Sequence, residues 1–284
     1  MSSLLRRGTS RVSVLRERDR RDLVRLMDAD PYVNVVAASR LRAAGLAAPG
    51  SPVLGVRDAD GTLTAAALHG GNLLPVGGAP EQWRALGSQL AGRRRGCTAI
   101  VGRDGAVEGV WQVLEPEWGP ARAWRVSQPL LVLDRSRPLP PGDPRLRAIR
   151  PAELDRYLPA AAAMFTEELG VSPYRAAVPG AYRRRVAALI GARRAFGIVE
   201  DGAVLFKADL GATSAYTCQV QGVWVRPDLR GRGLGRVGLA GVLRHALTLA
   251  PTASLYVNDF NVAARRLYAS LGMRQVATLA SVLL

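Results

Sequence analysis

Residues 223–235 read Val-Trp-Val-Arg-Pro-Asp-Leu-Arg-Gly-Arg-Gly-Leu-Gly. A mainly apolar run over residues 220–225 is typical of a buried strand. Pro227 and Asp228 end this strand, because proline has a fixed φ and no amide hydrogen to donate. After the glycines, apolar residues recur at helical spacing over residues 237–247. The sequence therefore predicts a strand, a tight glycine-rich turn and a helix in direct succession.

Such a turn is suited to binding an anion. Glycines at the alternating positions 231, 233 and 235 let the backbone approach a ligand and adopt φ values that other residues avoid. The first amides of the following helix have no acceptor within it, and the helix dipole adds about half a positive charge at that end. The turn is therefore predicted to hold a phosphate or a pyrophosphate. Full positive charges are added by Arg230, Arg232 and Arg236.

The spacing of these glycines narrows the class of ligand. The dinucleotide fingerprint needs G-x-G-x-x-G and the P-loop needs Gly-Lys-Ser/Thr, and residues 230–235 match neither pattern. The run Arg230-Gly231-Arg232-Gly233-Leu234-Gly235 does match Gln/Arg-x-x-Gly-x-Gly/Ala. It resembles the coenzyme A motif of the GNAT family of N-acetyltransferases. A glycine-rich turn that binds no coenzyme is the alternative.

A second segment strengthens this resemblance. Residues 254–257 predict a short strand, Asn261 a helix cap, and residues 262–271 a helix that stops at Gly272. The order Asn261, Tyr268, Gly272 and Met273 resembles the second GNAT signature. The two signatures stand in the order and at the separation usual for the family. The resemblance covers roughly Leu146 to Leu284.

The resemblance implies which residues contact the coenzyme. Backbone groups of Val223, Trp224 and Val225 would pair with the pantetheine arm, although plain sheet pairing is the alternative for them. Asn261 would hydrogen-bond the pantetheine or the pyrophosphate as well as cap its helix. Arg265 would reach a coenzyme phosphate unless it lies on a solvated helix face. The implied pyrophosphate turn consists of Arg230, Gly231, Arg232, Gly233, Leu234, Gly235 and Arg236.

The resemblance also implies acyl transfer to a neutral amine, with strand-edge amides holding the charge of the tetrahedral intermediate. Tyr268 stands at the family's general-acid position, where it would assist the leaving thiolate. A core tyrosine is the alternative. In some relatives a Glu on the strand before the turn acts as the general base, but in this sequence that position is Gln219. We therefore expect the general base at Glu167 or Glu168, unless they form only an exposed acidic helix end; Asp209 is a weaker candidate.

Composition bears on several other classes of function. The net charge is +16, and Lys207 is the only lysine among 39 basic residues. Such an arginine bias also arises from GC-rich codons, but the charge still predicts attraction of polyanions and steering of an anionic coenzyme. No nucleic-acid module is recognisable. The isolated cysteines and histidines predict no metal site. No run of about 18 apolar residues indicates a membrane span, and we expect a cytoplasmic protein.

The two halves of the chain share one order of predicted elements: strand, two helices, three strands, glycine-containing turn, helix, strand, helix and two short strands. We expect a degenerate GNAT-like domain at 1–136, a proline-rich linker at 137–144 and a catalytic GNAT domain at 145–284. The turn of the first half, residues 74–80, lacks an initial Arg or Gln and contains Pro80. We therefore do not expect it to bind coenzyme. An unrelated α/β domain is the alternative for this half.

The resemblance implies an α/β (α+β) fold of two tandem GNAT-like domains, each a mixed, mainly antiparallel sheet flanked by helices. The implied activity transfers an acetyl group from acetyl-CoA, a co-substrate, to a primary amine by direct attack on the thioester. The acceptor would be a small molecule or a peptide, with no specific nucleic acid and no membrane as partner. The first domain would shape the acceptor site or a protein interface, and a homodimer stays open.

Two alternatives to this activity remain. The first is a noncatalytic acyl-CoA-binding regulatory module, which the neutral Gln219 favours and Tyr268 argues against. The second is a small-molecule acetyltransferase similar to mycothiol synthase, which is also a tandem GNAT protein.

Overall fold

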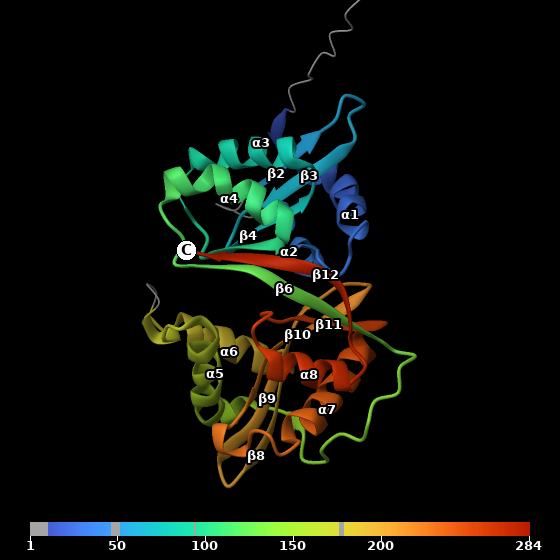
Figure 1. Ribbon diagram of the computed structural model, residues 1–284, viewed down its shortest axis with the longest axis vertical. Helices are drawn as coiled ribbons and strands as arrows, with labels where there is room; N and C mark the ends of the chain where they lie inside the picture. Colours follow the sequence, from blue (N-terminus) through green and yellow to red (C-terminus); the bar gives the residue numbers. More distant parts are fainter. Residues whose placement is uncertain (1–10, 47–51, 94, 176–178) are drawn as a thin grey trace, which may run out of the picture. The chain divides into compact units, whose positions relative to one another are not determined.

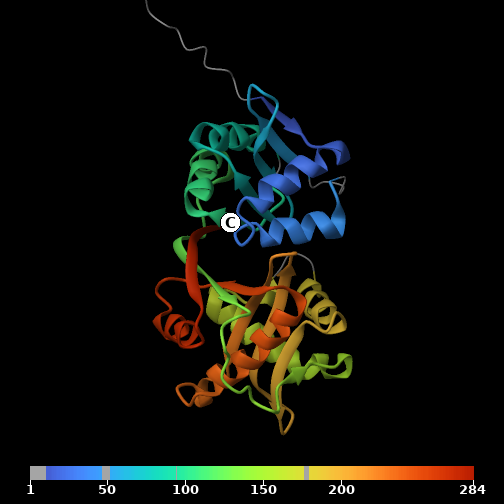
Figure 2. The same ribbon diagram turned by 90° about the vertical axis from the view of Figure 1, so that its right-hand side faces the viewer.

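The computed structural model describes residues 11–46, 52–93, 95–175 and 179–284, which divide into two compact units. The first unit comprises Met1–Leu130 together with Val276–Leu284, and the second comprises Leu131–Gln275. Each unit is a sheet with helices on both faces (Figure 1; Figure 2). Within the described ranges, every helix is too short or too polar to span a bilayer.

The first unit has the strand order β1-β2-β3-β4-β5-β12. Neighbouring strands are antiparallel except β4 and β5, which are parallel. The strands are β1 (Val12–Val14), β2 (Val53–Arg57), β3 (Leu63–Leu68), β4 (Asn72–Gly77), β5 (Ala99–Arg103) and β12 (Arg274–Leu283), and β6 (Ala123–Asp134) begins here. The helices are α1 (Arg20–Asp28), α2 (Val35–Ala44), α3 (Pro80–Ala91) and α4 (Asp104–Trp118), with the 3-10 turn η1 (Glu17–Asp19).

The helices of this unit bury two separate cores against the sheet. On one face α3 and α4 place Leu86, Leu90 and Trp111 against strand residues. On the other face of the sheet (Figure 1), α1 contributes Leu23 and Met27, and α2 contributes Leu41, to a second cluster. Alternate strand residues therefore serve opposite cores, as the pleat of a strand requires.

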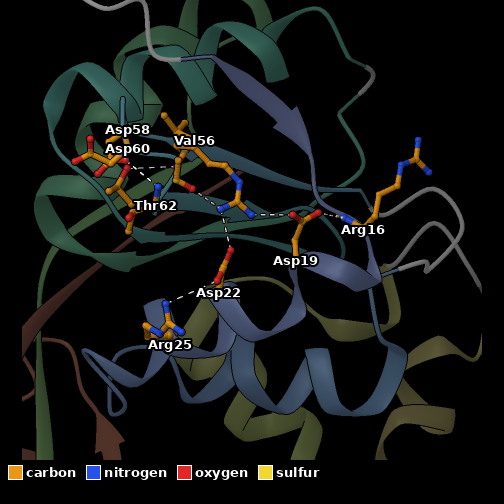
Figure 3. Close-up of polar contacts among 11 residues, drawn as sticks. Arg16, Asp19, Asp22, Arg25, Val56, Asp58, Asp60 and Thr62 are labelled. Carbon is orange, nitrogen blue, oxygen red and sulfur yellow. Dashed lines mark hydrogen bonds and ion pairs between the residues drawn. The ribbon is translucent and has the colours of Figure 1, made fainter.

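Charged groups also join α1 to β2 (Figure 3). Arg57 contacts Asp19 at 2.7 Å and Asp22 at 2.8 Å. The Arg16 amide, and then Arg57, hold the pKa of Asp19 below its usual value against the opposing effect of burial. Asp58 accepts hydrogen bonds from two amides of the β2–β3 turn, at 3.1 and 2.8 Å. These carboxylates are engaged in holding the fold together.

The second unit repeats this topology, with the order β11-β10-β9-β8-β7 and one parallel pair, β10 with β11. Its strands are β7 (Arg147–Ala148), β8 (Ala195–Glu200), β9 (Ala203–Thr213), β10 (Thr217–Val225) and β11 (Thr252–Tyr256). Its helices are α5 (Leu154–Leu169), α6 (Ala181–Gly191), α7 (Leu234–Leu249) and α8 (Val262–Ser270), with the 3-10 turns η2 (Pro151–Glu153), η3 (Pro173–Arg175) and η4 (Pro227–Leu229).

Two cores again lie on opposite faces of the sheet. Helices α7 and α8 pack Leu239, Leu243 and Tyr268 into one core. Helix α5 packs Tyr157 and α6 packs Ile190 into the other core. Both units therefore have a mixed, mainly antiparallel sheet flanked by helices, as the resemblance implied.

The boundaries of the two units differ from the expected 1–136 and 145–284. Strand β12 comes from the end of the chain, yet its residues Leu279–Leu283 pair with β5 in the first unit. Conversely, the end of β6, Leu131–Asp134, belongs to the second unit, where Leu131 and Leu133 enter the core. Each unit thus takes its sixth strand from the other half of the sequence.

Residues 137–144, expected to be a linker, lie along α7 instead. Arg244 donates a hydrogen bond to the carbonyl of Leu139 at 3.0 Å, and the Asp143 amide bonds to the Val237 carbonyl at 3.2 Å. A Cβ on Gly142 would meet the α7 backbone at Gly241 within 3.2 Å. The extended, proline-rich segment is therefore a packed part of the second unit.

Candidate functional site

The glycine-rich turn joins η4 to α7 as the sequence predicts. Gly231 and Gly233 have φ values of +75° and +83°, and α7 begins at Leu234 without a side-chain cap. The amides of Arg236 and Val237 bond to the Gly233 carbonyl, at 2.9 and 3.3 Å. Within the described part of the chain, no acceptor is recorded for the amides of residues 231–235. These five N–H groups at a helix N-terminus are suited to an anion.

The space outside the turn is open. A Cβ built on Gly231 or on Gly233 would meet nothing within 4 Å, so these glycines are required for their φ values and not for lack of room. Arg232 and Arg236 are exposed at the same place. Gly235 differs, because its Cβ would come within 3.3 Å of Val225 and 3.5 Å of Leu267. This glycine allows close contact between the turn, β10 and α8.

The strand that leads into the turn has an unpaired edge. β10 pairs with β11 at Thr217, Cys218 and Gln219, and no pairing of these two strands is recorded beyond Gln219 in the described ranges. The backbone of Val223, Trp224 and Val225 follows, so its edge toward β11 is left to another partner. This arrangement is suited to an extended ligand arm lying along β10.

Of the two proposed bases, Glu167 is engaged with the turn. Its Oε2 contacts Arg230 Nη2 at 2.7 Å, and its Oε1 accepts a hydrogen bond from Trp224 Nε1 at 3.1 Å. Arg230 also donates Nε to the Val225 carbonyl at 3.0 Å. The carboxylate therefore links the end of α5 to the turn, and each of its two oxygens already accepts from one donor.

The charge of Glu168, on α5, acts on Tyr268, on α8. Tyr268 is buried in the core between α7, α8 and the sheet. Its pKa is raised well above the ordinary value, mainly by burial and then by the negative charge of Glu168. The same charge acts on Tyr182 of α6. Tyr268, the residue that the sequence assigned as general acid, therefore retains its proton at neutral pH.

Asn261 and Arg265 lie at the start of α8. Asn261 Oδ1 accepts a hydrogen bond from the Ala264 amide at 3.1 Å and caps the helix, as one of its two expected roles requires. Arg265 is exposed and donates to the Asp259 carbonyl at 3.2 Å. Both side chains also have donor groups that these two hydrogen bonds do not use.

The corresponding turn of the first unit is closed. Gly77 and Gly78 have positive φ values, but a Cβ on Gly78 would lie 2.6 Å from Trp83 Nε1. That indole donates to the Gly77 carbonyl at 2.8 Å, and the Ala79 amide bonds to Gln82 Oε1 at 3.0 Å. Pro80, at the first helical position, has no amide hydrogen. Side chains therefore fill the place that an anion would take.

A buried polar cluster in the second unit was only partly foreseen. Lys207, the sole lysine, is fully buried on β9 and contacts Asp209 at 2.7 Å. Asp209 also accepts a hydrogen bond from the Tyr157 hydroxyl at 2.6 Å. The signal in the sequence was a lysine and an aspartate at alternating positions within an apolar strand. The described residues contain no group of three or more His, Cys, Asp or Glu side chains placed to hold a metal ion.

Comparison with known proteins identifies the second unit. Residues 158–273 match the model of the acetyltransferase (GNAT) family, and residues 51–157 match the model of a domain of unknown function, DUF4081. The second unit therefore carries a GNAT-family domain, a fold of acyltransferases, and the first unit repeats the same topology in degenerate form. The comparison with curated proteins gave no match.

Solved structures resemble the whole chain in fold. A GCN5-related N-acetyltransferase from Sphaerobacter thermophilus has a TM-score of 0.61 at 17% identity, with 96% of this chain and 95% of that chain covered. A GNAT-family acetyltransferase from Colwellia psychrerythraea has a TM-score of 0.57 at 16% identity, with 96% of this chain and 99% of that chain covered. A tandem GNAT protein of the clavulanic acid biosynthesis pathway has a TM-score of 0.54 at 16% identity, with 96% of this chain and 98% of that chain covered. These likenesses show that both units of the described chain share the fold of GNAT proteins.

Proposed function

We propose that the second unit transfers an acetyl group from acetyl-CoA to a primary amine by direct attack on the thioester. The observation that carries the proposal is the succession of an unpaired strand edge and an uncapped helix N-terminus. Among the residues that the structure describes, the edge of β10 after Gln219 has no pairing to β11, and the amides of residues 231–235 have no acceptor. An extended arm that ends in a diphosphate has the shape and charge to satisfy both.

In this proposal the diphosphate binds the turn amides, with Arg232 and Arg236 adding positive charge. The pantetheine arm pairs with the backbone of β10. The amine nitrogen attacks the thioester carbonyl carbon, the carbon–sulfur bond breaks, and coenzyme A leaves as a thiolate. The negative charge on the carbonyl oxygen of the intermediate is held by strand-edge amides.

Proton transfer requires a base and a hydrogen-bond donor. We assign the base to Glu168, because its negative charge acts on Tyr268, and we assign Glu167, which accepts from Trp224 and Arg230, a structural role. Tyr268 is the donor to the leaving sulfur. A thiol has a pKa of about 8.5, so full transfer from a phenol of raised pKa is uphill. Tyr268 therefore acts by donating a hydrogen bond and not by losing its proton completely.

The proposal is tested by calorimetric titration with acetyl-CoA and by thiol release in the presence of a panel of small and peptide amines. The variant Gly233→Asp should lose coenzyme binding, because it places a negative charge beside the diphosphate. Its matched control is Gly202→Asp, in the β8–β9 turn of the same unit. Gly202 has a similar φ of +77° and nothing within 4 Å of its Cβ position.

The results separate the candidate functions. Binding to the wild type and to Gly202→Asp, with loss in Gly233→Asp and thiol release with an amine, supports the acetyltransferase. Binding without thiol release from any amine supports a noncatalytic acyl-CoA-binding module, which the neutral Gln219 also favours. A wild type that does not bind acetyl-CoA contradicts both.

A further inference from the structure

The buried cluster of Lys207, Asp209 and Tyr157 lies beside the strand on which the proposed reaction takes place. Lys207 and Asp209 project from β9 toward α5, from which Tyr157 reaches Asp209. Lys207 Nζ also lies 5.4 Å from the centre of the Tyr157 ring. All three side chains are nearly or completely removed from solvent.

The cluster is opposite an irregularity in β10. Gln221 pairs with Asp209 and Trp224 pairs with Lys207, so three steps along β10 correspond to two along β9. One extra residue is therefore accommodated at Gly222–Val223, which is a β-bulge. The two charged residues are thus the register partners at the two ends of the bulge.

Gly222 brings the bulge into direct contact with the ion pair. Its φ is +59°, and a Cβ at this position would lie 2.9 Å from Lys207 Nζ and 3.2 Å from Asp209 Oδ2. It would also lie 2.9 Å from Met164 of α5. Because residue 222 has no side chain, the backbone of the bulge packs directly against the charged groups of Lys207 and Asp209.

Stability alone does not explain such a pair. Apolar residues of similar volume stabilise a core as well as a buried ion pair does, or better, because burial of charges is costly. What an ion pair adds is directional contact, and here each partner is fixed by more than one neighbour. Burial and the charge of Asp209 raise the pKa of Tyr157, so its hydroxyl keeps its proton and remains a donor.

We propose that Lys207, Asp209 and Tyr157 are positioning residues that hold the Gly222–Val223 bulge in the shape needed to polarise the thioester carbonyl. The inference rests on the proposed function, in which the pantetheine arm pairs with β10. The bulge frees backbone groups of β10 from the β9 ladder and aims them away from it. A cluster that fixes the bulge therefore fixes the direction of the amide that meets the carbonyl oxygen.

The test uses acetyl-CoA with carbon-13 at the thioester carbonyl, bound to the full chain and observed by NMR. The double variant Lys207→Met/Asp209→Leu removes both charges and leaves neither buried alone. We expect it to bind the coenzyme with wild-type affinity, because the turn is unchanged. The carbonyl resonance should move toward that of free acetyl-CoA, and thiol release should fall about 100-fold, as on loss of one oxyanion donor.

Two further variants serve as comparisons. Arg147→Met/Glu153→Leu removes a different ion pair of the same unit, between β7 and η2, and should leave the carbonyl resonance and the rate unchanged. Tyr157→Phe keeps the ion pair and the volume but removes one donor. It should shift the carbonyl resonance in the same direction as the double variant, by a smaller amount. If the double variant does not fold, Tyr157→Phe alone tests the positioning role.

Each outcome has one meaning. A wild-type resonance and rate in the folded double variant overturn the positioning role and leave the proposed function intact. If the double variant is unfolded, an unchanged carbonyl resonance in Tyr157→Phe likewise overturns the positioning role and leaves the proposed function intact. Absence of acetyl-CoA binding to the wild type overturns the proposed function and this inference with it.

Discussion

Glu167 and Arg230 form an ion pair, with Oε2 and Nη2 2.7 Å apart, that joins the end of α5 to the first residue of the glycine-rich turn. Both side chains are about half exposed, at 46% and 47%. Trp224 on β10 donates to the same carboxylate. A residue that the sequence indicated as a base is thereby placed as a link between a helix end, a strand and the turn.

We predict different effects for the two neighbouring glutamates. Glu167→Gln should retain most of its transfer rate, and its thermal stability should change little, because an exposed ion pair contributes about 0–1 kcal/mol. Glu168→Gln should lose about 100-fold or more in kcat, since it removes the proposed base. Steady-state kinetics of the two variants provide the comparison. Equal losses of rate would contradict the assignment of the base to Glu168.

Replacing Tyr268 by Phe should lower kcat by about 10- to 100-fold while coenzyme affinity stays the same. The reason is that the hydroxyl acts on the leaving sulfur, while the ring remains available for packing. Because the pKa of Tyr268 is raised, its proton is lost only at higher pH than in a free tyrosine. The wild-type rate should therefore not decline between pH 7 and pH 9 on account of this group. An unchanged kcat in Tyr268→Phe would make Tyr268 a packing residue only.

Glu153 should make stability depend on acid pH. The Arg147 guanidinium lowers its pKa from 4.5 to about 2, with help from the Arg150 amide and against burial. A carboxyl whose pKa is lower in the folded state stabilises the fold above its unfolded pKa. Its contribution, of the order of 2–3 kcal/mol, is lost as the pH falls from about 4.5 toward 2.

The measurement is the free energy of unfolding by urea at several pH values. Glu153→Gln should be less stable than the wild type at pH 6, and the difference should shrink as the pH decreases toward 2. A constant difference over this range would show that the Arg147–Glu153 pair does not produce the dependence.

Division of the chain at residue 136 should not give two folded domains. A fragment of residues 1–136 lacks β12, and this leaves the edge of β5 open and removes Ala280 and Val282 from the core. We expect it to be poorly folded by circular dichroism and by amide-proton NMR. The matched control joins residues 276–284 to this fragment through a flexible linker and should restore the fold. A stably folded fragment without these residues would refute the prediction.

The local elements around the turn could be predicted because local chemistry determines them. Proline at 227, glycines that need positive φ, and the helical spacing after them each act within a few residues. Asn261 as a helix cap and Pro80 at the start of the helix after the first unit's turn follow from the same kind of reasoning. The family resemblance then supplied the coenzyme and the acyl transfer, which local chemistry alone does not specify.

Other features depend on partners far away in the sequence. The two short strands that close each predicted half, within residues 124–134 and 274–284, are instead the continuous strands β6 and β12. The destination of each strand is decided by tertiary packing, which the order of elements does not reveal. In the same way, the partners of Glu167 lie 57 and 63 residues away, on Trp224 and Arg230.

The exchange of β6 and β12 between the two units has a consequence for synthesis of the protein. The first unit cannot acquire its sixth strand until residues 276–284 have left the ribosome, although the rest of it has been available since residue 130. Cotranslational folding of this half is therefore delayed until residues 276–284 have emerged, and the unfilled β5 edge is a place where chaperones or sister chains can bind in the meantime.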